Sequence, residues 1–270
     1  MTGTEAAAQH IDTSRPHPAR VYDWFLGGKD NYPVDEELGR RIHAIDAGAG
    51  RAARANRAFM RRAVRTLAED GVRQFLDIGT GIPTEPNLHQ IAQSAAPDAR
   101  VVYVDNDPIV LAHANALLRG TPEGVTEYVQ ADARDPGTIL ERAAAVLDFG
   151  RPVALSLVAL LHFVADEDGA HDLVATLLAA LAPGSCLVLS TMTADFEPEN
   201  VRMGIAAYAA GGVTLVARSR DEVGTFFEGL DLLPPGITSV SDWRPEDRPD
   251  GDGPVSLYGA VGRKPTGRPA

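Results

Sequence analysis

Apolar residues along this chain follow two patterns that alternate over most of its length. Short apolar runs, typical of strands buried on both faces of a parallel sheet, are separated by longer stretches with helical periodicity. The short runs lie in segments 74–84, 100–108, 125–135, 151–157 and 185–193. The helical stretches between them are 85–97, 108–120, 135–150 and 169–184. This alternation predicts an α/β domain built around a mostly parallel sheet.

The two ends of the chain follow other patterns. Residues 1–13 are small and polar, which favours disorder, and residues 265–270 read as a frayed tail. Residues 14–70 predict a helical extension, with an aromatic helix that stops at Gly27 and Gly28, a helix capped by Asp35, and an arginine-rich amphipathic helix over 52–69. Residues 71–264 then form the sheet domain.

The C-terminal part of this domain departs from the simple alternation. It predicts a short helix within 194–212, an extended segment at 213–219, a helix over 220–233 and two antiparallel strands at 236–243 and 254–264. A charged loop rich in proline and glycine separates the two strands.

Composition narrows the classes of partner. The 270 residues carry a net charge of −12, which argues against nucleic acid as a general partner. The single cysteine, Cys186, excludes an intramolecular disulfide and fits a reducing cytoplasm. The N-terminus lacks the apolar region of a signal peptide, and no apolar run reaches the ~18 residues of a membrane span. We therefore expect a cytoplasmic protein that does not bind membranes.

Acidic residues stand at the ends of three successive strands. Asp77 precedes a turn with Gly79 and Gly81, Asp105 ends the second run, and Asp132 ends the third. Glycines at such a turn allow the backbone to approach a ligand closely, and open α/β sheets bind ligands outside the carboxyl ends of their strands. A carboxylate at the tip of the second strand can accept both ribose hydroxyls of a nucleoside cofactor. The acids therefore predict one nucleoside pocket.

The sequences DIGTG at 77–81, YVDNDP at 103–108 and QADARDP at 130–136 resemble the first three motifs of class I S-adenosylmethionine (SAM) dependent methyltransferases. Residues 17–35, HPARVYDWFLGGKDNYPVD, resemble the signature of an uncharacterised, mainly actinobacterial family of S-adenosyl methyltransferases. The resemblance covers about residues 11–263. It implies a Rossmann-like seven-stranded class I methyltransferase sheet, mostly parallel with an antiparallel last strand, and an N-terminal helical lid.

The resemblance also implies a set of cofactor contacts. Asp105 would hold the ribose hydroxyls, Asp132 and the backbone of Ala133 would face the adenine, and Asp77 would lie near the methionine ammonium. The N-terminal lid would bring Lys29 and Asp30 to the methionine end. The full set expected to bind SAM is Tyr22, Asn31, Asp77, Gly79, Thr80, Gly81, Asp105, Asn106, Asp132, Ala133 and Ser156.

The sequence signals are less specific for the residues that would contact the methyl acceptor. The resemblance places a substrate-capping segment at about 193–217, and the side chains expected on this side are Val158, Phe163, Met192, Phe196 and Tyr208. Core packing is an equally good explanation for several of them. His162 is either a general base or a structural histidine. Asn56 and Arg57 could reach the mouth of the pocket, although a solvated face is the simpler interpretation for most arginines of that helix.

Three functions remain open. The first is a SAM-dependent methyltransferase acting on a small molecule, and the second is a non-catalytic SAM-binding or S-adenosylhomocysteine-binding regulatory protein. A dinucleotide-dependent oxidoreductase is disfavoured because Thr84 stands where the GxGxxG pattern requires glycine. The histidines lack metal-binding spacing, so we expect no metal. The NPPY-like motif of enzymes that methylate nucleic acid amino groups is missing, and an apolar surface on the N-terminal helices would allow a homodimer.

Overall fold

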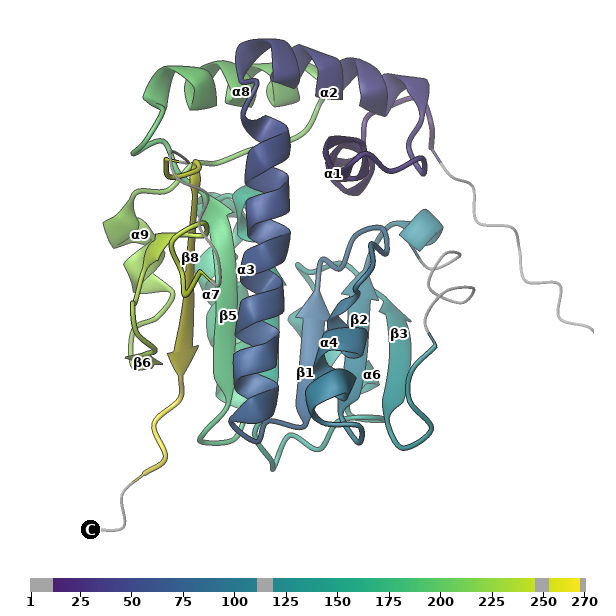
Figure 1. The fold of residues 1–270 in the computed structure, drawn as a ribbon, viewed down its shortest axis with the longest axis vertical. Coiled ribbons are helices and arrows are strands. Elements are labelled where there is room, and N and C mark those ends of the chain that lie inside the picture. Colours follow the sequence, from purple (N-terminus) through teal and green to yellow (C-terminus); the bar gives the residue numbers. More distant parts are fainter. Residues whose placement is uncertain (1–11, 111–118, 246–252, 268–270) are drawn as a thin grey trace, which may run out of the picture.

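The computed structural model describes residues 12–110, 119–245 and 253–267. One sheet runs through the molecule, in the order β3-β2-β1-β4-β5-β8-β6, with β7 paired to β8 (Figure 1). The parallel strands are β1 (Gln74–Ile78), β2 (Arg100–Asp105), β3 (Val125–Gln130), β4 (Ala154–Val158) and β5 (Cys186–Met192). The antiparallel part consists of β8 (Leu257–Arg263) with the two-residue strands β6 (Asp231–Leu232) and β7 (Thr238–Ser239).

The predicted methyltransferase sheet is confirmed, with its parallel strands at the expected positions and an antiparallel end. The strand expected at 236–243 is reduced to β7, and a second short strand, β6, precedes it. Pro234, Pro235 and Gly236 lie between the two pieces. Proline lacks the N–H that a sheet ladder needs, so a single continuous strand cannot form there.

Helices cover both faces of the sheet. The helices α3 (Ala49–Glu69) and α4 (Leu88–Ala95) cover one face, and α6 (Pro136–Ala143), α7 (Ala170–Ala180) and α9 (Arg220–Thr225) cover the other. Side chains alternate along each strand, so in β1 Phe75 joins the α3–α4 cluster while Leu76 and Ile78 join the opposite one. Figure 1 shows the long α3 in front of the sheet, running roughly along the direction of the strands.

Several helix boundaries differ from the sequence expectation. The helix α6 ends at Ala143 rather than near Gly150, and α9 ends at Thr225. Most of the helix expected at 108–120 lies outside the described residues, as do most of the N-terminal residues and the loop at 246–252. The segment 213–219 forms no strand, but it is extended and bonded to its neighbours: Val216 N–H donates to His162 O and Arg218 N–H donates to Met192 O.

Two parts of the chain that are distant in sequence form one layer beyond the carboxyl ends of the parallel strands (Figure 1). This layer, which we call the cap, consists of α1 (Pro18–Leu26), α2 (Pro33–Ile45), α8 (Pro198–Ala210) and the segment 211–215. It has its own apolar cluster, with the buried side chains Val21, Leu38, Ile42, Ala207, Tyr208 and Leu215. The apolar faces of the N-terminal helices thus pack on α8. The homodimer that was expected from these faces stays a prediction.

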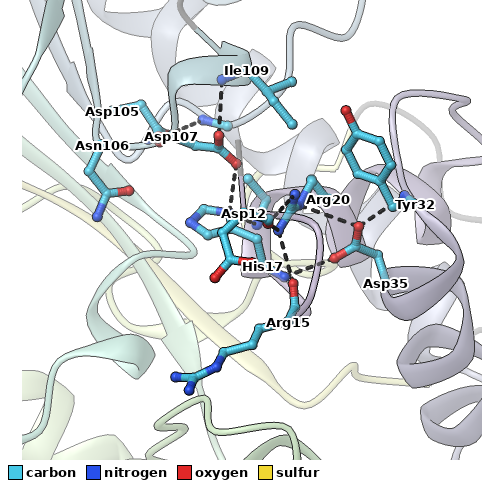
Figure 2. Close-up of polar contacts among 12 residues, drawn as sticks. Asp12, Arg15, His17, Arg20, Tyr32, Asp35, Asp105, Asn106, Asp107 and Ile109 are labelled. Atoms are coloured by element: carbon cyan, nitrogen blue, oxygen red, sulfur yellow. Dashed lines mark hydrogen bonds and ion pairs between the residues drawn. The ribbon is translucent and has the colours of Figure 1, made fainter. Parts of the chain in front are cut away.

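A buried ion pair joins α1 to α2 inside the cap. Arg20 Nε lies 3.3 Å from Asp35 Oδ2, and their side chains are 4% and 0% exposed (Figure 2). Asp35 also accepts hydrogen bonds from the backbone N–H groups of His17 (2.8 Å) and Tyr32 (2.9 Å). Asp35 was expected to cap α2 from outside. Instead α2 begins at Pro33, three residues before the expected first residue Glu36, and Asp35 caps from within the first turn.

Replacing Asp35 by alanine should therefore destabilise the protein strongly, because Arg20 is left buried without its anion. We expect a loss of ~3–5 kcal/mol in the free energy of unfolding. Urea denaturation followed by circular dichroism and tryptophan fluorescence measures it, since Trp24 lies in α1. The control is Arg40→Ala, which breaks an exposed ion pair with Glu36 and should cost less than ~1 kcal/mol. Equal losses in the two variants would contradict the prediction.

Candidate functional site

A cavity of about 530 Å³ lies between the carboxyl ends of the parallel strands and the cap. Its volume falls within the ~300–1,000 Å³ typical of small-molecule pockets. The sheet side is formed by the loops that follow β1, β2, β3 and β4, and the opposite side by α1, α2, α3, α8 and residues 212–215. The cavity therefore lies where a ligand site is expected in an open α/β sheet.

The loop after β1 forms the cavity floor with its backbone. Gly79 and Gly81 have φ values of 75° and 67°, a left-handed conformation that side chains disfavour. The N–H of Gly79 donates to Val104 O at 2.8 Å, and that of Gly81 donates to Asp105 Oδ2 at 2.8 Å. A Cβ atom on Gly79 would lie 2.7 Å from Leu160 Cδ1. The loop is thus held close to the end of β2, and the Leu160 side chain packs directly against the backbone of Gly79.

Asp105 and Asp77 are the buried strand-end acids of the cavity. Asp105 accepts from the N–H of Gly81 and, at 3.0 Å, from that of Asp107, while burial raises its pKa. Asp77 accepts from Ser156 Oγ at 2.6 Å, and burial raises the pKa of Asp77 to about 6. Ser156 does not line the cavity; it lies opposite Asp77 on β4 and orients that carboxylate.

The loop after β3 contributes part of the rim of the cavity. Asp132, Ala133 and Arg134 line the cavity after β3. Asp132 is half exposed and accepts a hydrogen bond from the N–H of Arg134 at 2.9 Å. The three strand-end acids expected from the sequence, together with Thr80 and Asn106, therefore border the same cavity.

The N-terminal segment enters the cavity wall in part as expected. Tyr22 lines the cavity, donates its hydroxyl hydrogen to Ala53 O and accepts from Asn56 Nδ2, both at 3.0 Å. Asn31 does not line it, because Asn31 Nδ2 donates to Asp23 Oδ2 at 2.8 Å and so holds the turn after α1. Lys29 and Asp30 are exposed and also lie outside the lining.

A polar contact that sequence analysis did not predict connects the cap to the sheet. His17 Nδ1 lies 3.1 Å from Asp107 Oδ2, and Asp107 Oδ1 accepts from the N–H of Ile109 at 2.9 Å (Figure 2). Asp107 is two residues beyond Asp105. The beginning of α1 is therefore attached to the same loop that supplies the buried acid of β2.

The helix α3 contributes two polar residues to the wall, Asn56 and Arg57. Asn56 is buried and its Oδ1 accepts from Ser190 Oγ at 2.6 Å. Arg57 Nη2 donates to the carbonyl oxygens of Thr84 (2.6 Å) and Pro86 (3.2 Å). The sequence does contain a signal for Asn56, because this polar residue lies on the apolar face of an amphipathic helix. A buried amide needs hydrogen-bond partners, so such a position indicates a polar site.

The cap side of the cavity is apolar. Val158, Phe163, Met192 and Tyr208 line it as expected, and the rings of Phe163 and Tyr208 lie 6.2 Å apart. The cap adds Ile42, Ile45, Val213 and Leu215, which sequence analysis did not identify. Phe196 is not in the lining; its ring packs against Tyr258, 5.2 Å away, beside the sheet core.

His162 lines the cavity and is buried, and its Nδ1 has no hydrogen-bond partner. Burial, with Arg218 nearby, lowers the pKa of His162 to about 3, so the imidazole is neutral at physiological pH. Arg218, 1% exposed, fixes the surrounding loop by donating to the carbonyl oxygens of Leu161 and Val164, both at 2.8 Å. The loop that presents His162 is therefore rigidly held.

The sequence matches the family described as S-adenosyl methyltransferase over residues 4–265. The chain belongs to this family. The resemblance inferred from the N-terminal signature and the three strand-end motifs is thereby confirmed. No protein of curated function shows significant sequence similarity to this chain.

Two solved structures are similar to this family member over nearly the whole chain. A DUF574 family protein from Streptomyces avermitilis MA-4680 is 50% identical, with a TM-score of 0.93, covering 95% of this chain and 100% of its own. A candidate methyltransferase from Thermobifida fusca YX is 38% identical, with a TM-score of 0.87 and coverages of 94% and 97%. Human N-acetylserotonin methyltransferase, solved with SAM, is 14% identical at a TM-score of 0.50 and shares the fold alone.

Membrane-spanning helices and metal clusters are both missing from the part of the chain that the structure describes. None of the described helices is both long and apolar enough to cross a membrane. No group of three or more histidine, cysteine, aspartate or glutamate side chains among the described residues could hold a metal ion.

Replacing Gly79 by alanine should destabilise the protein, because the new Cβ meets Leu160 and the backbone has a positive φ. We expect a cost of ~1–2 kcal/mol from the backbone conformation alone. The control is Gly204→Ala in α8, where no atom lies within 4 Å of the added Cβ. That change should stabilise the helix by ~0.4–1 kcal/mol. Thermal denaturation of both variants is the measurement, and shifts of the same sign would contradict the prediction.

Proposed function

We propose that this protein transfers the methyl group of SAM to a small-molecule acceptor. The observation that carries the proposal is the composition of the cavity between the strand ends and the cap. One side offers a glycine-containing loop and acids from three adjacent strand ends, and the other side offers a mostly apolar wall. A nucleoside cofactor fits the first and an organic acceptor fits the second.

The residues of the sheet side match the groups of SAM. The Asp105 carboxylate, oriented by two backbone N–H groups, keeps lone pairs for ribose hydroxyls. Gly79 and Gly81 leave room for the amino acid chain, and Asp77 supplies a carboxylate for the ammonium. Asp132 and Ala133 are the rim residues for the adenine. When bound, SAM supplies a methyl group on a cationic sulfonium, an electrophile that needs no metal.

The cap side supports a largely apolar acceptor. Ile42, Phe163, Met192 and Leu215 exclude water from this part of the cavity. A water-poor site strengthens the electrostatic interactions of the reacting groups, and fixed walls hold the acceptor in line with the methyl group. The net charge of −12 further disfavours nucleic acid as the acceptor.

His162 fits a hydrogen-bonding role better than that of a strong base. A general base works best when its pKa is near the operating pH, and burial lowers the pKa of His162 to about 3. Its unpartnered Nδ1 can accept a hydrogen bond from an acceptor hydroxyl or amine. In this proposal His162 orients the acceptor as a neutral imidazole, with its one proton on Nε2 and Nδ1 free to accept.

Binding of SAM and of S-adenosylhomocysteine is the direct test of the cofactor. Calorimetric titration should give micromolar or tighter affinity, equivalent to about −8 kcal/mol. Asp105→Ala and Asp105→Asn should weaken it by about ten- to a hundredfold, because hydrogen bonds to a charged group contribute ~1.5–3 kcal/mol. The control is Asp98→Ala, an exposed acid at the opposite end of β2 that pairs with Arg73. No binding to folded, ligand-free wild type would contradict the proposal.

Turnover separates an enzyme from a regulatory SAM-binding protein. Formation of S-adenosylhomocysteine with a panel of small phenols, amines and carboxylic acids supports methyl transfer. Tight binding without turnover across such a panel would favour the alternative, a sensor whose cap seals the cavity.

SAM affinity should also depend on pH through Asp77. The raised pKa of about 6 means that the free protein holds Asp77 mostly protonated at pH 5 and ionised at pH 7. An ionised carboxylate is needed for the ammonium, so affinity should rise about tenfold from pH 5 to pH 7. The Asp77→Asn variant should bind weakly and lack this component. Wild-type affinity that is flat over this range would contradict the assignment.

A further inference from the structure

One cation in the cavity wall lacks an anion. Two arginines line the cavity within the described part of the chain, Arg57 and Arg134. Arg134 Nη1 lies 3.5 Å from Asp132 Oδ1. Arg57 forms no ion pair with a described carboxylate; its Nη2 donates to two carbonyl oxygens, and its Nε is buried without a partner.

A buried donor left without a partner costs ~1–3 kcal/mol. Arg57 shares this feature with Arg61 but differs from it in lining the cavity. The two carbonyl bonds hold the guanidinium in place against Thr84 and Pro86, just beyond the glycine loop. Guanidinium groups fixed in cavities are suited to carboxylates and phosphates, which they bind through charge-assisted hydrogen bonds. The wall at this point is therefore arranged for an anionic group.

A negatively charged residue, Asp77, lies near Arg57 but does not pair with it. Asp77 borders the same end of the cavity, and the positive charge of Arg57 lowers the pKa of Asp77, although burial raises it more. The two side chains form no direct ion pair. A cation and an anion held separately in one cavity are complementary to an α-amino acid group, whose carboxylate and ammonium are joined through one carbon.

We propose that Arg57 binds the carboxylate of the methionine part of SAM and makes the site selective for nucleosides that carry this carboxylate. The inference rests on the proposed function. It assigns a role to α3, a helix placed before the sheet domain in sequence.

The experiment compares two ligands that differ only in the carboxylate. These are S-adenosylhomocysteine and its decarboxylated analogue, which keeps the ammonium, the thioether and the nucleoside. Wild-type protein should bind S-adenosylhomocysteine at least about tenfold more tightly in calorimetric titration. In Arg57→Met, affinity for S-adenosylhomocysteine should fall by at least about tenfold, while affinity for the analogue stays within about twofold. Arg57→Lys should be intermediate.

A matched control lies one turn along the same helix. Arg61 Nη2 donates to Glu85 O at 3.3 Å and its Nε is also buried without a partner, but Arg61 does not line the cavity. Arg61→Met should leave the ratio of the two affinities unchanged. Circular dichroism establishes that each variant is folded.

The outcomes separate this inference from the proposed function. If wild type binds neither ligand, the proposed function fails and Arg57 loses its assigned ligand with it. If wild type binds both ligands equally, or Arg57→Met weakens both by the same factor, the cofactor site stands and the role of Arg57 is only structural. If Arg57→Met keeps the wild-type ratio but slows transfer to anionic acceptors, Arg57 serves the acceptor, and the inference is overturned.

Discussion

The reversal of strand order between β1 and β4 is the constraint on which the rest of the structure depends. From β1 the chain adds β2 and β3 on one side, and then returns to add β4 and β5 on the other. The loops that follow β1 and β4 therefore diverge and leave a crevice at the carboxyl ends of the strands. Both Asp77 and the loop of His162 stand at this crevice. The position of the crevice follows from the order in which the chain connects the strands, and does not depend on the side chains.

Keeping two buried acids ionised at this crevice costs free energy unless a ligand binds there. Burial raises the pKa values of Asp77 and Asp105, which reflects the cost of charging them away from water. Backbone N–H groups offset part of this cost for Asp105, and Ser156 does so for Asp77. A cationic ligand would offset more. The cap completes the enclosure, and its attachments at His17–Asp107 and Tyr22–Asn56 lie beside the same acids.

Local sequence patterns were sufficient for the sheet side of the site. Apolar runs located β1 to β5, and the rule that parallel strands end at one edge brought Asp77, Asp105 and Asp132 together. These inferences need only the local pattern of apolar residues and the rule that parallel strands end at the same edge of a sheet.

The cap side could not be derived in the same way. Whether Phe196 or Ile42 faces the cavity depends on how α2 packs against α8, more than 150 residues later in the chain. Asn31 was assigned to the cofactor on its place in a signature, but its amide is bonded to Asp23. Arg57 was one of many arginines on α3, and only its position against Thr84 and Pro86 distinguishes it from the solvated ones. Such contacts arise from tertiary packing, which leaves no periodic signal.

The two sides of the cavity are therefore built under different constraints. The sheet side consists of backbone turns and strand-end acids, and changes there would disturb the sheet itself. The cap side consists of apolar side chains from helices that contact the sheet mainly through α3 and a few polar bonds. Exchange of one apolar side chain for another costs little stability when volume is kept. In the proposed function, changes at Ile42, Ile45, Val213 or Leu215 alter which acceptor fits, while the strand-end acids and the fold stay the same.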